Sequence, residues 1–293
     1  MIWLLEDTVL PELHASMRET AAKLGHEVWA WDADNPPRVE DKRPLVFHGS
    51  LNVASDISTT TRQASRLGYW PGGYCHTSVY RCSAYYELAR PWLLHQNWWF
   101  MTAAEFCSGV VGSRVGSAGR LLKDAGPKLF VRPDSPLKQF SGRVIDLENP
   151  CTARPRLEDL DFGFYYDDPN LPIVVAPFIP DLGMEWRFVV VDGVVVAGSG
   201  YVPWTRKGAG PAPRDSWPWG MAQEIAREFP RRQTDAYAPL VLDRVYCIDL
   251  VEPEVSKWGA RLRLVELTPF SGADLYDCDL EAVMRAVEIS VNT

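Results

Sequence analysis

The chain has 293 residues, of which 46% are hydrophobic and 23% charged, so its composition is that of a folded globular protein and excludes a disordered or fibrous one. At roughly 150 residues per domain, this length allows about two domains, or one large domain with lobes. The formal net charge of -8 argues against a protein that coats nucleic acid or an anionic membrane by bulk electrostatics.

Three further features of the sequence limit the cellular location and the kinds of metal, redox and nucleophilic chemistry that we expect. No apolar run approaches the roughly 20 residues that span a bilayer, and the first residues lack the basic start of a signal peptide, so we expect a cytoplasmic protein. The six cysteines include no C-x-x-C pair, which disfavours a zinc ribbon or a redox motif. All five histidines lie in the first third of the chain, which excludes His-dependent nucleophilic catalysis confined to the C-terminal part.

The first 97 residues predict a small α/β domain. Apolar runs and helical spacing of apolar residues indicate strands at 2–5, 27–31 and 45–48, and helices at 11–24 and 52–66. Strands that alternate with helices favour a parallel sheet. The stretch 68–96 is rich in Pro, Gly, Tyr and Trp and shows no period, so we place the domain boundary near its end, after residue 97.

Beyond residue 97 the pattern favours helices and antiparallel strands. The expected elements are helices at 102–109, 114–124, 221–228 and 280–289, and strands at 129–131, 173–178, 185–191, 194–198, 244–250 and 261–267. Asp192-Gly193 lies between two β-branched runs, which is a strong hairpin signal. Residues 203–220 are expected to form a loop. The C-terminal half is therefore predicted to be mostly antiparallel α+β.

A basic segment carries the first candidate binding residues. Residues 114–143 hold seven basic and two acidic side chains. Lys128 and Arg132 fall on one predicted strand, and Lys138 falls on the loop that ends at Ser141-Gly142. Charge, backbone N–H groups and glycine are what a phosphate group needs. A solvated basic face is the alternative, because the loop does not match the phosphate-loop pattern of nucleotide-binding proteins.

The last two predicted strands carry a candidate metal site. Asp249 and Glu266 each lie at the end of an apolar run, and a hairpin of these runs would place the two carboxylates side by side. Such a pair repels unless a cation lies near it, and Mg²⁺ binds one or two carboxylates together with substrate phosphates. Two exposed acids at strand ends are the alternative interpretation.

Four segments in order resemble the signatures of the ATP-grasp superfamily. They are FVRPDSPLKQFSG, EWRFVVVDGVVVAGSGY, YCIDL and LVELTPFSGADLY. More narrowly, the sequence is similar to the small R-two-K clade of phage-associated and bacterial ligase-like proteins, which also has counterparts of VFHGSLNVA, PGGYCHTSVYRCSAYY and LLHQNWWF. The resemblance covers most of the chain from about Leu45 onward.

This resemblance implies a fold of the class α/β plus α+β. A small α/β domain (1–97) would precede two α+β lobes (98–175 and 176–293) that hold MgATP between their sheets. Arg132 would take the place of the strand lysine that contacts the nucleotide phosphates, and Lys138 would lie on the loop that closes over them. Lys128 would be a neighbour of the phosphates, while Arg132 and Lys138 would be catalytic together with an arginine of the second lobe.

The resemblance also assigns roles around the hinge and the hairpin that follows it. The backbone N–H and C=O groups of the hinge strand, at Ala176, Phe178 and Ile179, would form hydrogen bonds with the edge of the adenine. Glu185 is expected near the ribose or the loop. Arg187 would be the catalytic arginine of the second lobe, directed at the transferred phosphate or the acyl phosphate.

Asp249 and Glu266 match the magnesium carboxylates of the superfamily. Two departures accompany this match. Thr268 stands where an asparagine ligand is usual, so a hydroxyl replaces a carboxamide oxygen at the metal. Gly200 precedes Tyr201, where the clade often has a second arginine.

The function implied is that of an ATP-dependent carboxylate–amine ligase, which forms an amide or peptide bond through an acyl phosphate. Its partners would be ATP, Mg²⁺, a small-molecule or peptide carboxylate and an amine, with no membrane among them. The acidic net charge speaks against a nucleic-acid substrate, although a short or tRNA-like one stays open. Two alternatives stay open: a nucleotide-binding or partner-binding protein without turnover, and an ATP-dependent phosphotransferase.

Overall fold

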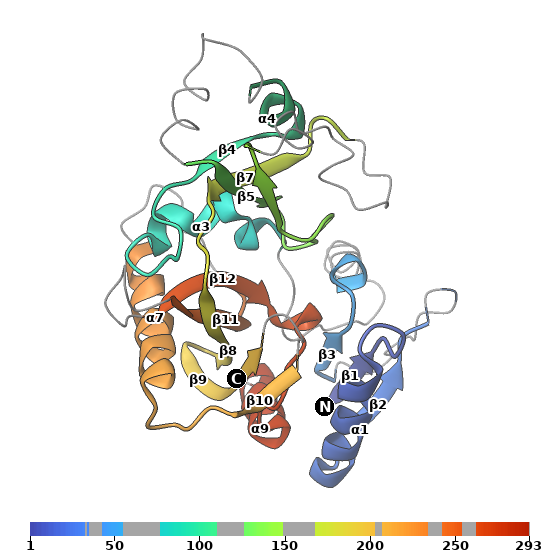
Figure 1. Ribbon diagram of the computed structural model, residues 1–293. Coiled ribbons are helices and arrows are strands. Elements are labelled where there is room, and N and C mark those ends of the chain that lie inside the picture. Colours follow the sequence, from blue (N-terminus) through green and yellow to red (C-terminus); the bar gives the residue numbers. More distant parts are fainter. Residues whose placement is uncertain are drawn as a thin grey trace. The chain divides into compact units, whose positions relative to one another are not determined.

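The computed structural model describes residues 1–32, 34, 43–54, 77–109, 126–148, 168–202, 207–233, 242–253 and 262–292. The chain forms two compact units, unit 1 (Met1–Tyr80 with Gly183–Thr293) and unit 2 (Arg81–Leu182) (Figure 1). The predicted helix at 114–124 and most of the one at 52–66 lie outside the described residues. The division into domains 1–97, 98–175 and 176–293 stays a prediction.

A parallel sheet forms the N-terminal part of unit 1. Its strand order is β2-β1-β3, with β1 at Ile2–Leu5, β2 at Glu27–Ala30 and β3 at Leu45–His48. The helix α1 (Pro11–Leu24) connects β1 to β2, as predicted. Pro11 opens this helix, and Gly25 closes it in the left-handed conformation that glycine adopts without strain.

A five-stranded antiparallel sheet forms the rest of unit 1. Its order is β10-β9-β8-β11-β12, with β8 at Leu182–Val191, β9 at Val194–Val202, β10 at Lys207–Pro211, β11 at Val245–Pro253 and β12 at Arg263–Pro269. Asp192 and Gly193 join β8 to β9, and both have positive φ angles, 47° and 77°. Two such residues characterise the type I′ hairpin turn, so the predicted hairpin is confirmed.

The two sheets of unit 1 share one hydrophobic core. Trp3 and Met17 from the N-terminal part pack in the same cluster as Val189, Phe270 and Val283. The described helices of the C-terminal part are α7 (Trp217–Gln233) and α9 (Leu280–Asn292), with the 3-10 turn η2 (Phe270–Gly272). The 3-10 turn η1 (Thr77–Tyr80) ends the N-terminal segment of unit 1. The shared core explains why residues from both ends of the chain form one unit.

Unit 2 is built on a four-stranded antiparallel sheet. Its order is β4-β7-β5-β6, with β4 at Trp99–Thr102, β5 at Lys128–Pro133, β6 at Arg143–Asp146 and β7 at Pro172–Pro177, and its helices are α3 (Cys82–Ala89) and α4 (Ala103–Gly109). Thr102 and Glu105 cap the start of α4 reciprocally: the N–H of Thr102 donates to Glu105 Oε2 (2.7 Å) and the N–H of Glu105 to Thr102 Oγ1 (3.2 Å).

Four elements differ from the expectation. The helix α3 lies in the stretch 68–96, where no period was recognised, although its buried residues Cys82, Tyr85, Tyr86 and Ala89 have helical spacing. The strands β4 and β6 were not predicted. The strand β10 lies within the predicted loop 203–220, because pairing with β9 stabilises a Gly- and Pro-rich segment of low strand propensity.

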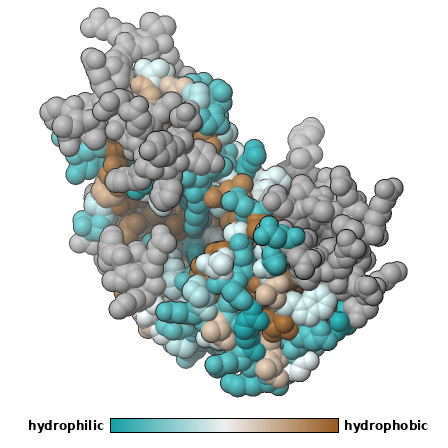
Figure 2. Space-filling view, turned by 90° about the vertical axis from the view of Figure 1, so that its right-hand side faces the viewer, coloured by the Kyte–Doolittle hydropathy of each residue, from teal (hydrophilic) through white to brown (hydrophobic). Residues whose placement is uncertain are grey.

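The described surface shows scattered apolar side chains. In Figure 2, hydrophilic and hydrophobic residues are interspersed over the lower part of the view, where unit 1 lies. Its exposed apolar side chains include Val9, Val194 and Ile289, which come from different elements. Single apolar residues of this kind are ordinary on a protein surface. Of the helices that the structure describes, none has the length and hydropathy needed to traverse a bilayer.

Candidate functional site

The two predicted metal carboxylates lie opposite each other in the sheet of unit 1. Asp249 on β11 pairs directly with Glu266 on β12, so the predicted juxtaposition is confirmed. Both side chains are buried, with 1% and 9% of the residue surface exposed. Thr268 lies two residues beyond Glu266 on the same face, and its hydroxyl donates to Asp249 Oδ2 at 3.1 Å. Three oxygen-bearing side chains therefore meet on one face of the sheet.

Arg187 binds the first of these carboxylates. It lies on β8, next to β11, and its Nε and Nη2 donate to Asp249 Oδ1 and Oδ2, both at 2.7 Å. Its Nη1 donates to the backbone carbonyl of Asp274 at 2.9 Å. Burial alone would lower the pKa of the Arg187 guanidinium, but the Asp249 carboxylate outweighs burial and raises this pKa well above its ordinary value. The guanidinium is thus charged, and it forms a bidentate ion pair.

Glu185 adds a further acid to the same cluster. It precedes Arg187 by two residues on β8, and the hydroxyl of Tyr201 donates to its Oε2. Burial raises the pKa of Glu185, and the nearby carboxylates of Asp249 and Glu266 raise it further, against the Tyr201 hydrogen bond. The carboxyl group of Glu185 is therefore easier to protonate than an ordinary glutamate.

Two stacked tyrosines border Arg187. The rings of Tyr201 and Tyr276 stack with centroids 4.3 Å apart, and the Arg187 guanidinium lies 5.4 Å from the Tyr276 ring centroid. Sequence analysis assigned no role to Tyr276 or to Asp274, whose carbonyl accepts from Arg187. Both residues fall within the segment LVELTPFSGADLY that carries the resemblance, so this segment was the available signal.

The side chains of Glu185, Asp249 and Glu266 lie together with Arg187 on β8, β11 and β12, and we call these four residues the acidic cluster of unit 1. Arg187, Asp249 and Glu266 are buried, and Glu185 is half-buried. Hard oxygen donors suit Mg²⁺, which uses one or two carboxylates. Asp249 Oδ2 accepts two hydrogen bonds, from Arg187 Nη2 and from the Thr268 hydroxyl. Asp249 Oδ1 accepts one hydrogen bond, from Arg187 Nε, and keeps a second lone pair. The donor set therefore fits a magnesium ion, although no group of three or more His, Cys, Asp or Glu side chains in the described ranges has a metal-binding arrangement.

The predicted phosphate ligands lie on β5 of unit 2. Leu129 and Val131 point into the core of this unit, so Lys128, Phe130 and Arg132 lie together on the other face. Lys128 is exposed, and its Nζ lies 3.6 Å from Asp146 Oδ2. The two basic side chains therefore share one face, with an aromatic ring between them.

His95 covers that ring. It stacks on Phe130 with centroids 5.4 Å apart and an interplanar angle of 12°. Burial, with a smaller contribution from the charge of Arg132, lowers the pKa of His95 to about 4. A neutral imidazole therefore lies beside Phe130 on the same face as the candidate phosphate ligands. The sequence pattern gave no role to His95, although it falls within the segment LLHQNWWF, one of those that carry the resemblance.

The loop that carries Lys138 is held at both ends. Asp134 is buried and accepts the N–H of Ser83 at 2.8 Å and its hydroxyl at 2.5 Å, and Phe140 lies in the core of unit 2. Lys138 has a positive φ of 48°, in the left-handed region that costs a non-glycine residue energy. These two anchors restrict the segment that carries Lys138, and the closing of this loop over the nucleotide stays a prediction.

The predicted hinge continues β7. Ala176 pairs with Phe130 within the sheet, and the N–H of Phe178 donates to the carbonyl of Lys128 at 3.0 Å. The N–H of Phe178 is therefore used in a hydrogen bond of the sheet. Of the residues predicted to contact the adenine, Ile179 is the first that lies beyond this bond.

The sequence matches no protein-family model and no curated protein. Solved structures resemble the chain over its whole length. The ATP-grasp ligase PsnB, in a complex with a phosphomimetic variant of a minimal precursor, Mg and ADP, matches with a TM-score of 0.57 and 14% identity, over 100% of this chain and 98% of PsnB.

Two further structures show the same likeness. The D-alanine–D-alanine ligase of Bacillus anthracis has a TM-score of 0.57 at 11% identity, over 99% of this chain and 97% of the ligase. A RimK domain protein of Sphaerobacter thermophilus has a TM-score of 0.53 at 12% identity, over 99% of this chain and 97% of that protein. The chain therefore has the ATP-grasp fold, of the class α/β plus α+β, with a small α/β part at its N-terminus.

Proposed function

We propose that this chain is an ATP-dependent carboxylate–amine ligase. In the first step a carboxylate oxygen of the substrate attacks the γ-phosphorus of ATP, the bond from that phosphorus to the β–γ bridging oxygen breaks, and ADP leaves. In the second step an amine nitrogen attacks the acyl carbon, the bond from this carbon to the phosphate oxygen breaks, and phosphate leaves. The proton of the attacking nitrogen passes to a base, and an amide is the product.

The acidic cluster of unit 1 is the observation that carries this proposal. Asp249 and Glu266 are buried and face each other across β11 and β12, and Thr268 adds a hydroxyl on the same face, so three oxygen donors meet there. In a protein with the ATP-grasp fold, a divalent cation is the ligand that this set of oxygen donors fits. Asp249, Glu266 and Thr268 would hold the ion. When bound, Mg²⁺ supplies charge neutralisation at the phosphates.

Basic side chains would meet the remaining phosphate charge. Arg132 and Lys128 share one face of β5, and Lys138 lies on the anchored loop that follows. Arg187 keeps N–H groups beyond its three bonds within the described residues, since a guanidinium has five. These cations would stabilise the charge that spreads over the transferred phosphoryl group. No side chain of the cluster needs to act as a nucleophile.

One observation favours a second candidate, a nucleotide-binding protein without turnover. Both oxygens of Asp249 are bonded to Arg187. If this ion pair persists in the presence of MgATP, Asp249 offers the metal ion only the second lone pair of Oδ1, and Arg187 offers the phosphate only its remaining N–H groups. This candidate predicts nucleotide binding without release of ADP from any mixture of carboxylates and amines.

Titration calorimetry with MgADP tests the nucleotide site. Arg132→Ala and Glu266→Gln should each weaken binding by about 1.5–3 kcal/mol, roughly 10- to 150-fold, which is the scale of a charged hydrogen bond. Arg244→Ala and Glu281→Gln make the same changes in exposed ion pairs of unit 1 and should leave the affinity unchanged.

Release of ADP then separates the two candidates. Wild-type protein that binds MgADP should release ADP from ATP when a suitable carboxylate and amine are supplied together, and mass spectrometry should detect the amide. Failure of folded wild-type protein to bind MgADP would refute both candidates, and binding without ADP release in a broad screen would refute the ligase.

A further inference from the structure

The helix α3 begins without a cap from its own N-terminal residue. The side chain of Arg81, at the N-cap position, forms no hydrogen bond to the first turn, so the first N–H groups need another acceptor. Asp134 supplies it from 51 residues along the chain: its Oδ1 accepts the N–H of Ser83 at 2.8 Å, and its Oδ2 accepts the Ser83 hydroxyl at 2.5 Å. Asp134 therefore joins the end of β5 to the start of α3.

Both sides of this contact are rigid. Asp134 is buried, and its N–H donates to the carbonyl of Pro172 at 2.8 Å, which extends the pairing of β5 with β7. The helix α3 buries one face, which consists of Cys82, Tyr85, Tyr86 and Ala89. Within the described residues the Asp134 carboxylate is bonded to Ser83 alone, so its charge is met by the start of a helix and not by a cation.

The segment that follows Asp134 carries Lys138 and has little freedom. The N–H of Leu137 donates to Ser135 Oγ at 3.2 Å, and the N–H of Lys138 donates to the Ser135 carbonyl at 3.5 Å. Phe140 then lies in the core of unit 2. Lys138 itself has a φ of 48°, a conformation that persists in a residue other than glycine only where its surroundings fix it. Asp134 and Phe140 thus determine where the backbone of Lys138 lies.

Attraction to phosphate does not explain an acid at position 134. Arg132, two residues before it, and Lys138, four residues after it, are the phosphate ligands that we propose. A carboxylate between them repels a phosphate group. The two hydrogen bonds to Ser83 do explain it, because they fix the point at which the strand ends and the loop begins. A loop that is ordered in advance loses less conformational entropy when a ligand binds.

We propose that Ser83 and Asp134 are positioning residues for the phosphate-binding loop. They hold the loop in its binding conformation before the nucleotide arrives, so that Lys138 meets the phosphates beyond the α-phosphate. The effect on phosphate binding rests on the proposed nucleotide site, whereas the ordering of the loop by this contact does not.

A comparison of MgADP with AMP tests this role, because AMP lacks the β-phosphate. Ser83→Ala and Asp134→Ala should each weaken MgADP binding by about 3- to 10-fold, the scale of a hydrogen bond. AMP binding, measured by displacement of a fluorescent ADP derivative, should stay within twofold of wild type. Unchanged MgADP binding in both variants would overturn the proposal. Equal weakening of AMP and MgADP would also overturn it, since it would show general damage to the unit.

Two further variants separate position from charge. Asp134→Asn keeps both hydrogen bonds, because its amide accepts the N–H of Ser83 and donates to the hydroxyl, so MgADP binding should stay within twofold. Glu105→Ala is the matched control, since the Glu105 carboxylate accepts the N–H and the hydroxyl of Thr102 at the start of α4, at 2.7 and 3.0 Å. It removes the same charge and the same pair of bonds, and MgADP binding should again stay within twofold. Weakening in either variant equal to that in Asp134→Ala would contradict the proposal.

Hydrogen exchange followed by mass spectrometry tests the loop without nucleotide. In Ser83→Ala the amides of residues 135–139 should exchange at least threefold faster than in wild type, while those of β5 and β6 keep their rates. If this segment loosens but folded wild-type protein does not bind MgADP, the nucleotide site fails and the positioning of the loop stands. If wild-type protein binds MgADP and the exchange of this segment is unchanged, the positioning role fails alone.

Discussion

Replacement of Arg187 by methionine is expected to lower the free energy of unfolding by about 3–5 kcal/mol. Arg187 and Asp249 form a bidentate pair in which both N···O distances are 2.7 Å, and only 7% and 1% of the two side chains are exposed. Methionine fills similar space but leaves the Asp249 carboxylate buried, without its cation and beside Glu266. Loss of one partner from a buried pair costs this much because the other charge stays uncompensated.

The chain contains a matched control for this change. Arg244 and Asp192 form the same bidentate pair, at 2.7 and 3.0 Å, but their side chains are 52% and 42% exposed. Because water screens an exposed pair, Arg244→Met should cost less than about 1 kcal/mol. Urea unfolding followed by tryptophan fluorescence measures both variants. Costs that differ by less than 1 kcal/mol would refute the argument that burial makes the Arg187 pair important.

Three further predictions concern stability. Gly198→Ala should cost about 1–3 kcal/mol in urea unfolding, because the added Cβ would lie 2.4 Å from a ring carbon of Phe188; a neutral result would contradict this packing. Tyr201→Phe should cost about 1.5–3 kcal/mol, because it removes the hydrogen bond to the Glu185 carboxylate, and an unchanged midpoint would show that water replaces the hydroxyl. Burial lowers the pKa of His48 from 6.5 to about 3, so between these values the unfolded chain binds a proton that the folded one does not, and stability falls with falling pH. From pH 6.5 to 5 this amounts to roughly 1.7 kcal/mol, and in His48→Gln that part of the pH dependence should disappear.

Local signals predicted the parts of the site that depend on a single strand or hairpin. The turn at Asp192-Gly193 needs positive φ angles that its residues favour, so the sequence alone indicates it. The pairing of Asp249 with Glu266 follows from two apolar runs joined by a short connection, because strand alternation then fixes the facing residues.

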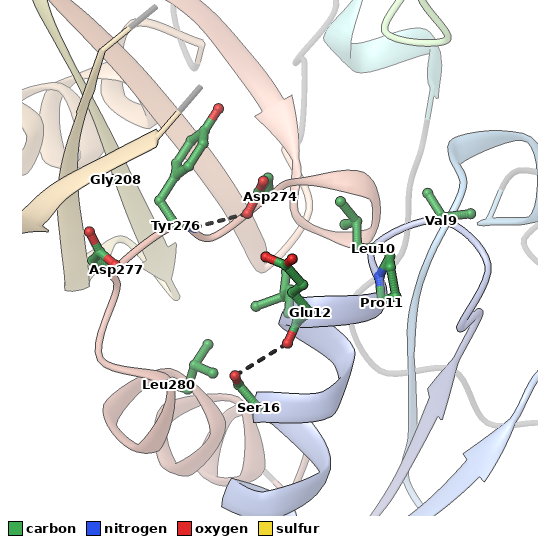
Figure 3. A pocket seen from close by; sticks show the side chains of 11 residues that line it. Val9, Leu10, Pro11, Glu12, Ser16, Gly208, Asp274, Tyr276, Asp277 and Leu280 are labelled. Carbon is green, nitrogen blue, oxygen red and sulfur yellow. Dashed lines mark hydrogen bonds between the residues drawn. The ribbon is translucent and has the colours of Figure 1, made fainter. Parts of the chain in front are cut away.

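Contacts between distant segments could not be predicted in this way. Arg187 and Asp249 are 62 residues apart, and sequence analysis assigned each to a different ligand instead of to the other. Their pairing requires that β8 lies beside β11, and no local sequence pattern indicates this strand order. Glu12 and Asp274, which line one pocket of unit 1 (Figure 3), illustrate the same limit, since only the packing of this unit brings them to one place.

The common core of unit 1 has a consequence for synthesis on the ribosome. Val46, from the last strand of the parallel sheet, is buried in one cluster with Val287, near the end of the chain. At roughly 5–20 residues per second, about 12–50 seconds pass between the synthesis of the two. During this time the N-terminal strands lack the apolar surface that covers them in the folded protein. Nascent chains should therefore bind chaperones through their first 50 residues until the final helix emerges.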